Sequence, residues 1–77
     1  MDDKTFLKKL GLTIQRIRKE KGITQVELGD SCDSEKSSIN RIESGRTNPT
    51  ILTLRKIAQG LNVTVDEILK FEEKKKS

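Results

Sequence analysis

The sequence is poor in several of the residues from which active sites are built. It has no His, Trp or Tyr, and only one Cys and one Pro in 77 residues. Without His, a Ser-His or Cys-His catalytic pair and a His/Cys metal site are excluded. The single cysteine, Cys32, cannot form an internal disulfide. We interpret it as a small buried hydrophobe, the alternative being a redox-sensing thiol.

Long hydrophobic runs are absent too. No apolar stretch approaches the roughly 18 residues of a membrane span, and the acidic start Met1-Asp2-Asp3 lacks the basic and apolar regions of a signal peptide. A phosphate-binding loop and paired carboxylates of a catalytic cleft are also missing from the motifs. We therefore expect a cytoplasmic protein that is not an enzyme, does not enter a membrane and needs no metal or cofactor.

The residues that are present suit one small domain. Sixteen Ile and Leu residues can fill a single core. Such a core contributes only about 3–5 kcal/mol to the free energy of folding, so either close helix packing or self-association is expected to help. Sixteen Lys and Arg against 12 Asp and Glu leave a formal charge of +4. This favours nucleic acid or an anionic membrane as partner, although charged side chains also serve simply as a solvated surface. We expect one domain over residues 1–71 and a polar, frayed tail over residues 72–77.

Hydrophobic residues recur at three- and four-residue steps, so the sequence predicts helices and no strand. The first helix begins near Asp3 or Thr5 and ends at Gly22. A Thr-x-x-Glu capping box opens a second helix at Thr24 and a fifth at Thr64. Short helices with tight connections predict an all-α globule in which helices cross at steep angles.

The two remaining helices lie between these capping boxes. The second helix is expected to end near Cys32, because Asp33 tolerates a left-handed φ and Ser34 is a good N-cap. The third is expected over residues 34–44, with Ser34 as its N-cap and Gly45 after its end. Thr50 caps the fourth, which ends around Asn62. The residues expected to point inward are Leu7, Leu10, Ile14, Ile17, Ile39, Ile42, Ile51, Leu54, Ile57, Ala58, Leu61, Val65, Ile68 and Leu69.

The second and third predicted helices, residues 25–32 and 34–44, are separated by a turn so short that they must cross steeply. This is helix-turn-helix geometry, here spanning residues 24–44. Gly29 supplies the small residue that the crossing needs. Leu28, Cys32, Ile39 and Ile42 supply its apolar anchors.

Three blocks of sequence together resemble the phage-repressor-type (xenobiotic-response-element) helix-turn-helix family, and the short length resembles restriction-modification controller proteins. The resemblance implies a compact five-helix, lambda-repressor-like DNA-binding domain. It further implies a homodimeric transcription regulator that binds a (pseudo)palindromic operator in the major groove of double-stranded DNA, with no small-molecule ligand. The blocks are Ile17-Arg18-x-x-Lys21-Gly22-Ile23-Thr24-Gln25-x-x-Leu28, Ser38-Ile39-x-x-Ile42-Glu43-x-Gly45-Arg46-x-x-Pro49 and Leu54-x-x-Ile57-Ala58-x-x-Leu61-x-Val63.

The outward residues of the third helix are the candidates for base reading. Lys36, Ser37 and Arg41 match base-reading positions of the family, against the alternative of a solvated charged face. Asn40 lies to the side of that face and is expected to touch a phosphate or a base. Glu35 is expected to cap the helix or to accept from cytosine N4 if it reaches.

Phosphate contacts are expected around this helix. Gln25, at the start of the second helix, is expected to contact a phosphate or to be a polar first residue that supports the helix cap. Arg46, Thr47 and Asn48 in the following loop donate to phosphates or form a solvated turn, and Arg46 is the strongest candidate because its guanidinium matches phosphate geometry.

Other residues are expected to act structurally. The resemblance implies that Arg18 and Glu43 pair across the first and third helices. Leu12 is left over from the inward stripe of the first helix. Candidates for a symmetric dimer interface are Ile51, Leu52, Leu69 and Phe71, with the division of the fifth helix between core and interface left open.

Two other functions compete with this regulator. One is an antitoxin-type autorepressor, which the short polar tail disfavours. The other is a helical protein-interaction module that does not bind DNA, for which loss of Arg41 or Lys36 would leave function intact.

Overall fold

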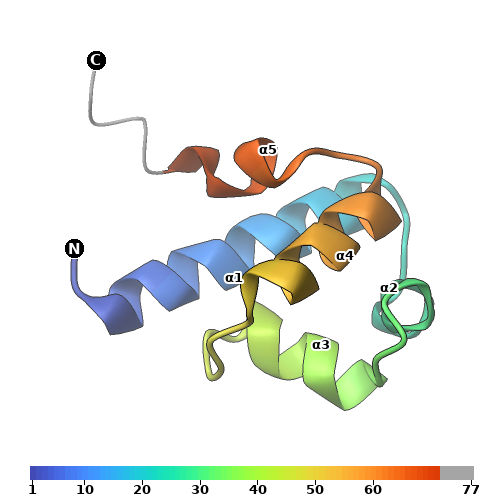
Figure 1. Cartoon of the computed structure of the whole chain (residues 1–77), viewed down its shortest axis with the longest axis horizontal. Coiled ribbons are helices and arrows are strands. Elements are labelled where there is room, and N and C mark those ends of the chain that lie inside the picture. The colour runs from blue at the N-terminus through green and yellow to red at the C-terminus, as the bar shows by residue number, and fades with distance from the viewer. Residues whose placement is uncertain (72–77) are drawn as a thin grey trace.

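The computed structural model describes residues 1–71, so the predicted frayed tail lies outside the described range. Within residues 1–71 every regular element is a helix, and no strand forms (Figure 1). The prediction of an all-α fold is confirmed. The helices are α1 (Asp3–Glu20), α2 (Gln25–Ser31), α3 (Lys36–Glu43), α4 (Ile51–Leu61) and α5 (Val65–Leu69).

Side-chain caps begin four of these five helices. In α2 the Thr24 hydroxyl accepts from the Glu27 backbone N–H at 3.0 Å, and the Glu27 carboxylate accepts from the Thr24 N–H at 2.8 Å. The same reciprocal pair joins Thr64 and Glu67 at α5. Both predicted capping boxes are confirmed. α1 and α4 have simpler caps, from the side chains of Asp2 and Thr50.

Four helices end in one pattern, in which a left-handed residue follows the helix and the next N–H returns to a carbonyl five residues earlier. After α2, Asp33 adopts a φ of 55°, and the Ser34 N–H donates to the Gly29 carbonyl at 2.8 Å. The predicted left-handed Asp33 is confirmed. The left-handed residues after α1, α2, α3 and α4 are Gly22, Asp33, Gly45 and Asn62.

The start of α3 differs from the prediction. Ser34 is not its N-cap, because this residue completes the end of α2: its N–H returns to α2, and its hydroxyl donates to the Cys32 carbonyl at 3.4 Å. Glu35 therefore takes the N-cap position, with φ −90° and ψ 159°, and Lys36 is the first helical residue. The Glu35 side chain makes no cap hydrogen bond. Its predicted capping role is therefore wrong.

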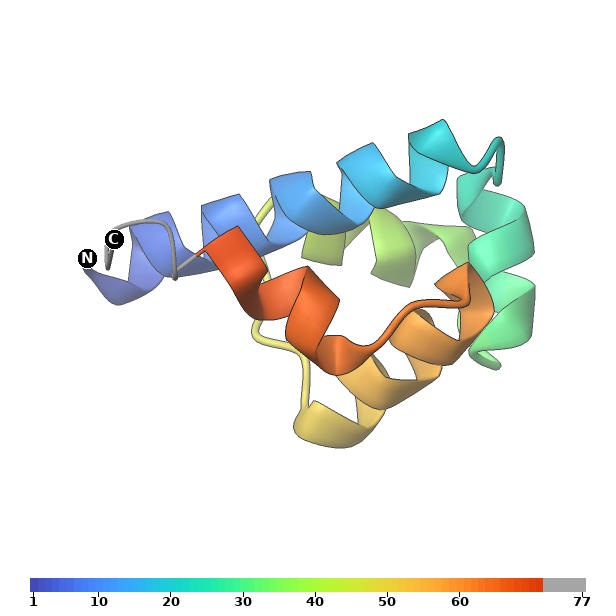
Figure 2. The ribbon, with the colours of Figure 1, turned by 90° about the horizontal axis from the view of Figure 1, so that it is seen from above.

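The helices close a ring around one core. α1 contacts α3 and α5, α2 contacts α3 and α4, and α4 contacts α5 (Figure 2). Each helix therefore covers the core from a different side. The buried hydrophobic residues are Leu10, Ile14, Ile17, Leu28, Cys32, Ile39, Ile42, Leu54, Ile57, Ala58, Leu61 and Ile68.

Two glycines allow helices to approach closely. A Cβ atom on Gly29 of α2 would lie 2.7 Å from the carbonyl oxygen of Ser34, in the turn before α3, so the predicted small residue is needed where this turn folds back onto α2. A Cβ on Gly11 of α1 would collide with the carbonyl oxygens of Ile42 and Glu43 at the end of α3. Gly11 was not singled out by sequence because nothing in its local pattern reveals a neighbour from a distant helix.

One predicted core residue lies outside the core. Ile51 is 65% exposed, because it occupies the first position of α4 and projects beyond the neighbouring helices. Leu7, Val65 and Leu69 are partly buried and pack against the core from its edge. None of the helices within residues 1–71 combines the length and hydrophobicity needed to cross a bilayer.

Candidate nucleic-acid interface

α3 separates apolar and polar residues onto two sides of one short helix. Ile39 and Ile42 are 1% and 6% exposed and face the core. Lys36, Ser37 and Arg41, the predicted base-reading residues, are all exposed. The core therefore supports α3 from behind and leaves its polar side to solvent.

The polar side of α3 and the loop that follows it line one shallow hollow of about 430 Å³. The ion pairs within residues 1–71 are Arg16–Glu20 and Arg18–Glu43, so the cations of the hollow are not consumed by ion pairs there. A set of unpaired cations beside hydroxyl and amide groups is suited to an anionic, hydrogen-bonding ligand. The lining residues are Lys36, Ser37, Asn40, Arg41 and Arg46.

Arg46 is held against α3 by two hydrogen bonds. Its Nε donates to the Ser44 hydroxyl at 3.0 Å, and an Nη donates to the Asn40 side-chain oxygen at 3.3 Å. Because a guanidinium has five N–H donors, the remaining ones stay available for a ligand. In the same loop, which follows α3, Thr47 is half-buried and Asn48 is exposed.

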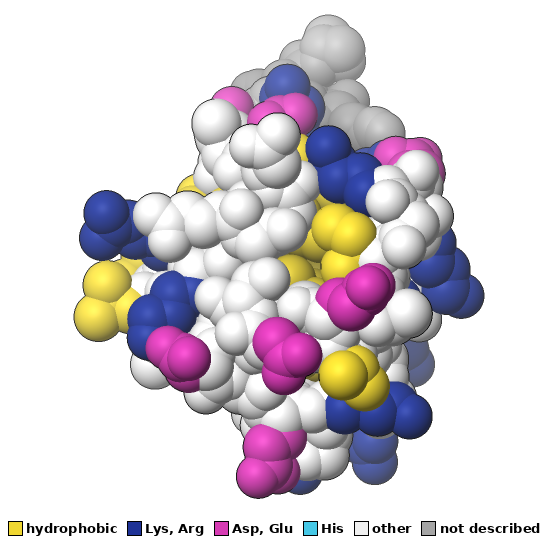
Figure 3. Space-filling model, turned by 90° about the vertical axis from the view of Figure 1, so that its right-hand side faces the viewer, with side chains coloured by type: hydrophobic (Ala, Val, Ile, Leu, Met, Phe, Trp, Pro, Cys, Tyr) yellow, Lys and Arg dark blue, Asp and Glu magenta, His cyan; other side chains and the backbone are white. Residues whose placement is uncertain are grey.

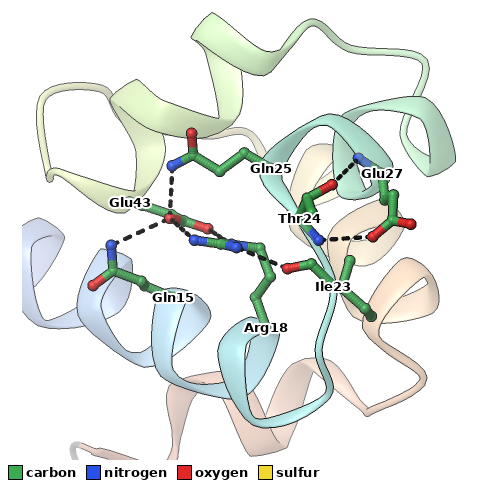
Figure 4. A network of polar contacts seen from close by, with 7 residues as sticks. All are labelled: Gln15, Arg18, Ile23, Thr24, Gln25, Glu27 and Glu43. Carbon is green, nitrogen blue, oxygen red and sulfur yellow. Dashed lines mark hydrogen bonds and ion pairs between the residues drawn. The ribbon is translucent and has the colours of Figure 1, made fainter.

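A buried ion pair joins the C-terminal end of α3 to α1 (Figure 4). Arg18 Nε donates to Glu43 Oε2 at 2.6 Å, and an Arg18 Nη donates to Glu43 Oε1 at 3.1 Å. The two side chains are 9% and 2% exposed. Another Nη of Arg18 donates to the Ile23 carbonyl at 2.7 Å, which ties the α1–α2 connection to the pair. This pair holds three helices at one junction.

Gln25 belongs to this junction as well, a role that sequence reasoning missed. Its Nε2 donates to Glu43 Oε1 at 3.0 Å, and Gln15 Nε2 donates to the same oxygen at 3.5 Å (Figure 4). No local signal could have revealed these contacts, because the partners lie 18 and 28 residues apart. One amide hydrogen of Gln25 is left for a ligand at the start of α2.

The side of the molecule that carries α2 has a different charge from the surface of α3. Glu27, Asp30 and Asp33 are exposed there. Carboxylates lie across the middle and lower part of this side, while Lys and Arg side chains gather toward its edges (Figure 3). Carboxylates repel a polyanion, so the charge distribution favours approach over α3 and the loop after it.

Cys32 is the C-cap residue of α2 and lies in the core. It is 3% exposed, and burial raises the pKa of its thiol. A thiol with a raised pKa holds less thiolate at neutral pH and is poorly reactive. The interpretation of Cys32 as a buried hydrophobe is therefore preferred over a redox-sensing thiol.

The four dimer-interface candidates divide into two kinds. Ile51 and Leu52, at the start of α4, are 65% and 62% exposed. Leu69 and Phe71 are partly buried against the core, and the Phe71 ring lies 5.3 Å from the Phe6 ring, centroid to centroid. The start of α4 is thus the more open apolar surface. Leu12 is 56% exposed on α1.

Comparisons with known proteins agree with this geometry. A family model described as helix-turn-helix matches residues 14–68. The chain is 37% identical over 62 residues to y4dJ, an uncharacterized HTH-type transcriptional regulator of Sinorhizobium fredii, with 80% of each chain covered. It is 37% identical over 60 residues to the immunity repressor of Bacillus phage phi105, covering 78% of this chain and 42% of the repressor.

A solved structure gives the same answer at the level of the fold. The restriction-modification controller protein C.AhdI from Aeromonas hydrophila matches with a TM-score of 0.84 at 25% identity, over 88% of this chain and 99% of that one. The resemblance to phage-repressor-type regulators and to controller proteins is confirmed. The five-helix fold with its helix-turn-helix is confirmed with it.

Proposed function

This chain belongs to the helix-turn-helix family of DNA-binding transcriptional regulators, and we propose that it binds a (pseudo)palindromic operator as a homodimer. Each copy would place the first turn of α3 in the major groove, with the two α3 helices about 34–36 Å apart. The observation that carries this proposal is the exposed polar side of α3, where Lys36, Ser37 and Arg41 face solvent from a helix supported by the core.

The residues of the hollow divide into base-reading and phosphate-binding groups. Arg41 and Lys36 carry donors suited to guanine O6 and N7, and the Ser37 hydroxyl pairs with either donors or acceptors. The side-chain oxygen of Asn40 accepts from Arg46. Asn40 would lie between the two groups and touch a phosphate or a base. Base contacts from this short set would choose the operator sequence.

Phosphate contacts would fix the register of the protein on the duplex. Arg46 is suited to this because two of its hydrogen bonds fix its guanidinium beside α3 and leave other donors available. Thr47 and Asn48 extend the same contact along the loop. Gln25 would contribute its second amide hydrogen at the start of α2, with Glu43 holding the first.

Self-association would place two α3 helices on one face of the duplex. Ile51 and Leu52 form the exposed apolar surface at the start of α4, which loses its contact with water when paired across a two-fold axis. Leu69 and Phe71, on the edge of the core, would extend this contact. Dimer formation would then depend on protein concentration, so regulation acts by mass action without a small-molecule ligand, a cofactor or catalysis.

The names of the relatives indicate how binding would be used. One is an immunity repressor and another is a restriction-modification controller protein. We propose that this chain is likewise a regulator, a cytoplasmic protein that changes transcription by occupying an operator. Repression or control of a restriction-modification locus is therefore the role we propose for this chain.

Selection of bound duplexes from a randomised pool tests sequence-specific binding. We expect one palindromic site to be enriched and the affinity for it to fall steeply with salt, because Lys and Arg release counterions from phosphates. A chain that prefers no duplex over random DNA would contradict the proposal. If Arg41→Ala and Lys36→Ala left the cellular function intact, a protein-interaction module without DNA binding would be the better description.

Sedimentation equilibrium tests the dimer. Leu52→Asp is expected to shift the chain to monomer and to weaken operator binding, since a charge at a two-fold interface meets its own copy. Leu12→Asp, which changes another exposed leucine on α1, serves as the control and is expected to remain dimeric. Unchanged association of the Leu52→Asp variant would exclude the start of α4 as the interface.

A further inference from the structure

Glu35 holds an unusual position at the start of α3. It is the N-cap residue, yet its side chain accepts no hydrogen bond from the first turn of the helix that it caps. Instead Glu35 Oε1 accepts from the Ser37 hydroxyl at 3.5 Å, so the carboxylate is placed beside a residue that lines the hollow. Glu35 is exposed, and the ion pairs within residues 1–71 do not include it.

A free carboxylate is costly at a surface that binds DNA. It repels phosphates, and it repels the base-edge acceptors guanine O6 and N7, adenine N7 and thymine O4. Neither folding nor general affinity accounts for Glu35, because it forms no cap bond and carries the sign of charge that opposes DNA. A carboxylate in this place has one favourable partner in the major groove, an exposed amino group of a base.

We infer that Glu35 is a specificity-determining residue that accepts a hydrogen bond from cytosine N4 in each operator half-site; this rests on the DNA binding proposed above. Cytosine presents an amino donor in the major groove, which a carboxylate accepts. Adenine also has an amino donor, but its neighbouring N7 acceptor would face the negative charge, so cytosine is preferred. Glu35 therefore adds to base choice while lowering affinity for every other sequence.

This role predicts a change of base preference that a structural role would not cause. Glu35→Gln replaces the carboxylate with an amide, which pairs with adenine N6 and N7 together. The variant is expected to change the preferred base at one position of each half-site from cytosine to adenine. Glu35→Ala is expected to lose the preference there. Both variants should melt like the original chain, because no cap bond is removed.

The experiment is selection from a randomised duplex pool with the original chain, Glu35→Gln, Glu35→Ala and Asp30→Asn. Asp30 is an exposed carboxylate on α2, so Asp30→Asn removes the same charge on the acidic side and controls for net charge. The original chain and Asp30→Asn should favour cytosine at the position by roughly tenfold over other bases. The preference should change only in the two Glu35 variants.

The outcomes separate this inference from the proposed function. If the original chain enriches a site and both Glu35 variants enrich the identical site, the cytosine contact is overturned while DNA binding stands. A preference for a base other than cytosine that depends on Glu35 also overturns the assignment. If the original chain enriches no sequence at all, the proposed function fails, and the inference fails with it.

Discussion

The inner and outer sides of α3 carry charged side chains in opposite surroundings. On the inner side, at the C-terminal end of the helix, Glu43 is 2% exposed and paired with Arg18, and two glutamines donate to the same carboxylate. Along the outer side, Lys36 and Arg41 are exposed and belong to none of the ion pairs within residues 1–71. A charge that the protein itself neutralises maintains the fold, whereas a charge left in water remains available for a ligand.

This difference explains why similar residues on one helix have different roles. Burying a charge costs several kcal/mol, a cost that is offset only where partners satisfy it fully. Among residues 1–71, every buried side-chain polar atom has a hydrogen-bond partner. The exposed cations have no such cost, and their loss removes nothing from the interior. Substitutions on the buried side of α3 should therefore act on stability, and substitutions on its outer side on binding.

The largest effect is expected from Glu43→Ala, which leaves the Arg18 guanidinium buried without its partner. The free energy of unfolding should fall by about 3–5 kcal/mol, measured by urea denaturation. Glu35→Ala removes a carboxylate of the same type from the other end of α3 and should change stability by less than about 0.5 kcal/mol. Equal melting temperatures for the two variants would contradict the distinction between buried and exposed charges.

A smaller loss of stability is expected from Gly11→Ala. The added methyl group would meet the carbonyl oxygens of Ile42 and Glu43, so α1 and α3 must move apart. The cost of such overpacking is about 1–3 kcal/mol, set against about 1 kcal/mol gained in helix propensity. Thermal unfolding measures the balance. A variant more stable than the original chain would show that α1 and α3 can move apart at little cost in free energy.

Arg41→Ala should act on binding and leave folding alone. Operator affinity is expected to fall by about 1–3 kcal/mol, with relaxed preference at one base pair, while the melting temperature stays unchanged. Fluorescence anisotropy with operator and mutant duplexes measures the affinity and the base preference. Lys70→Ala removes an exposed cation from the residue that follows α5, a helix that packs against α1 and α4, and should bind normally. An equal loss in both variants would mean that only net charge matters.

The smallest effect is expected from Arg46→Ala. Loss of one phosphate contact should weaken binding to all sequences alike, with no change in base preference. The slope of log affinity against log salt should become less negative by about 0.9. Titrations at several salt concentrations give this slope. A changed base preference in the variant would assign Arg46 to base reading instead.

Much of the fold was predictable because the signals are local. The capping boxes at Thr24 and Thr64 and the left-handed Asp33 depend on residues within a few positions of each other, and all three predictions are confirmed. The predicted N-cap Ser34 was wrong although it is also local, since one residue cannot both complete α2 and begin α3. The end of α2 and the N-cap of α3 compete for the same residue, and only the three-dimensional structure of the turn shows which of them uses it.

The candidate site was predictable only in part. The exposed side of α3 follows from its helical periodicity, so the surface positions of Lys36 and Arg41 agree with expectation. The inward prediction for Ile51 failed because periodicity gives the direction of a side chain but not how far the neighbouring helices extend. The contact between Gln25 and Glu43 could not be found in any local pattern.

The sequence by itself determined where four of the five helices begin and which side of each helix is apolar, because these features depend on hydrogen bonds and spacing within one or two turns. Only the tertiary structure decided that two glutamines donate to Glu43, that Gly11 must remain small, and that the Glu35 side chain makes no cap hydrogen bond beside the polar side of α3. Those features depend on contacts with other parts of the chain, which no local spacing of residues encodes.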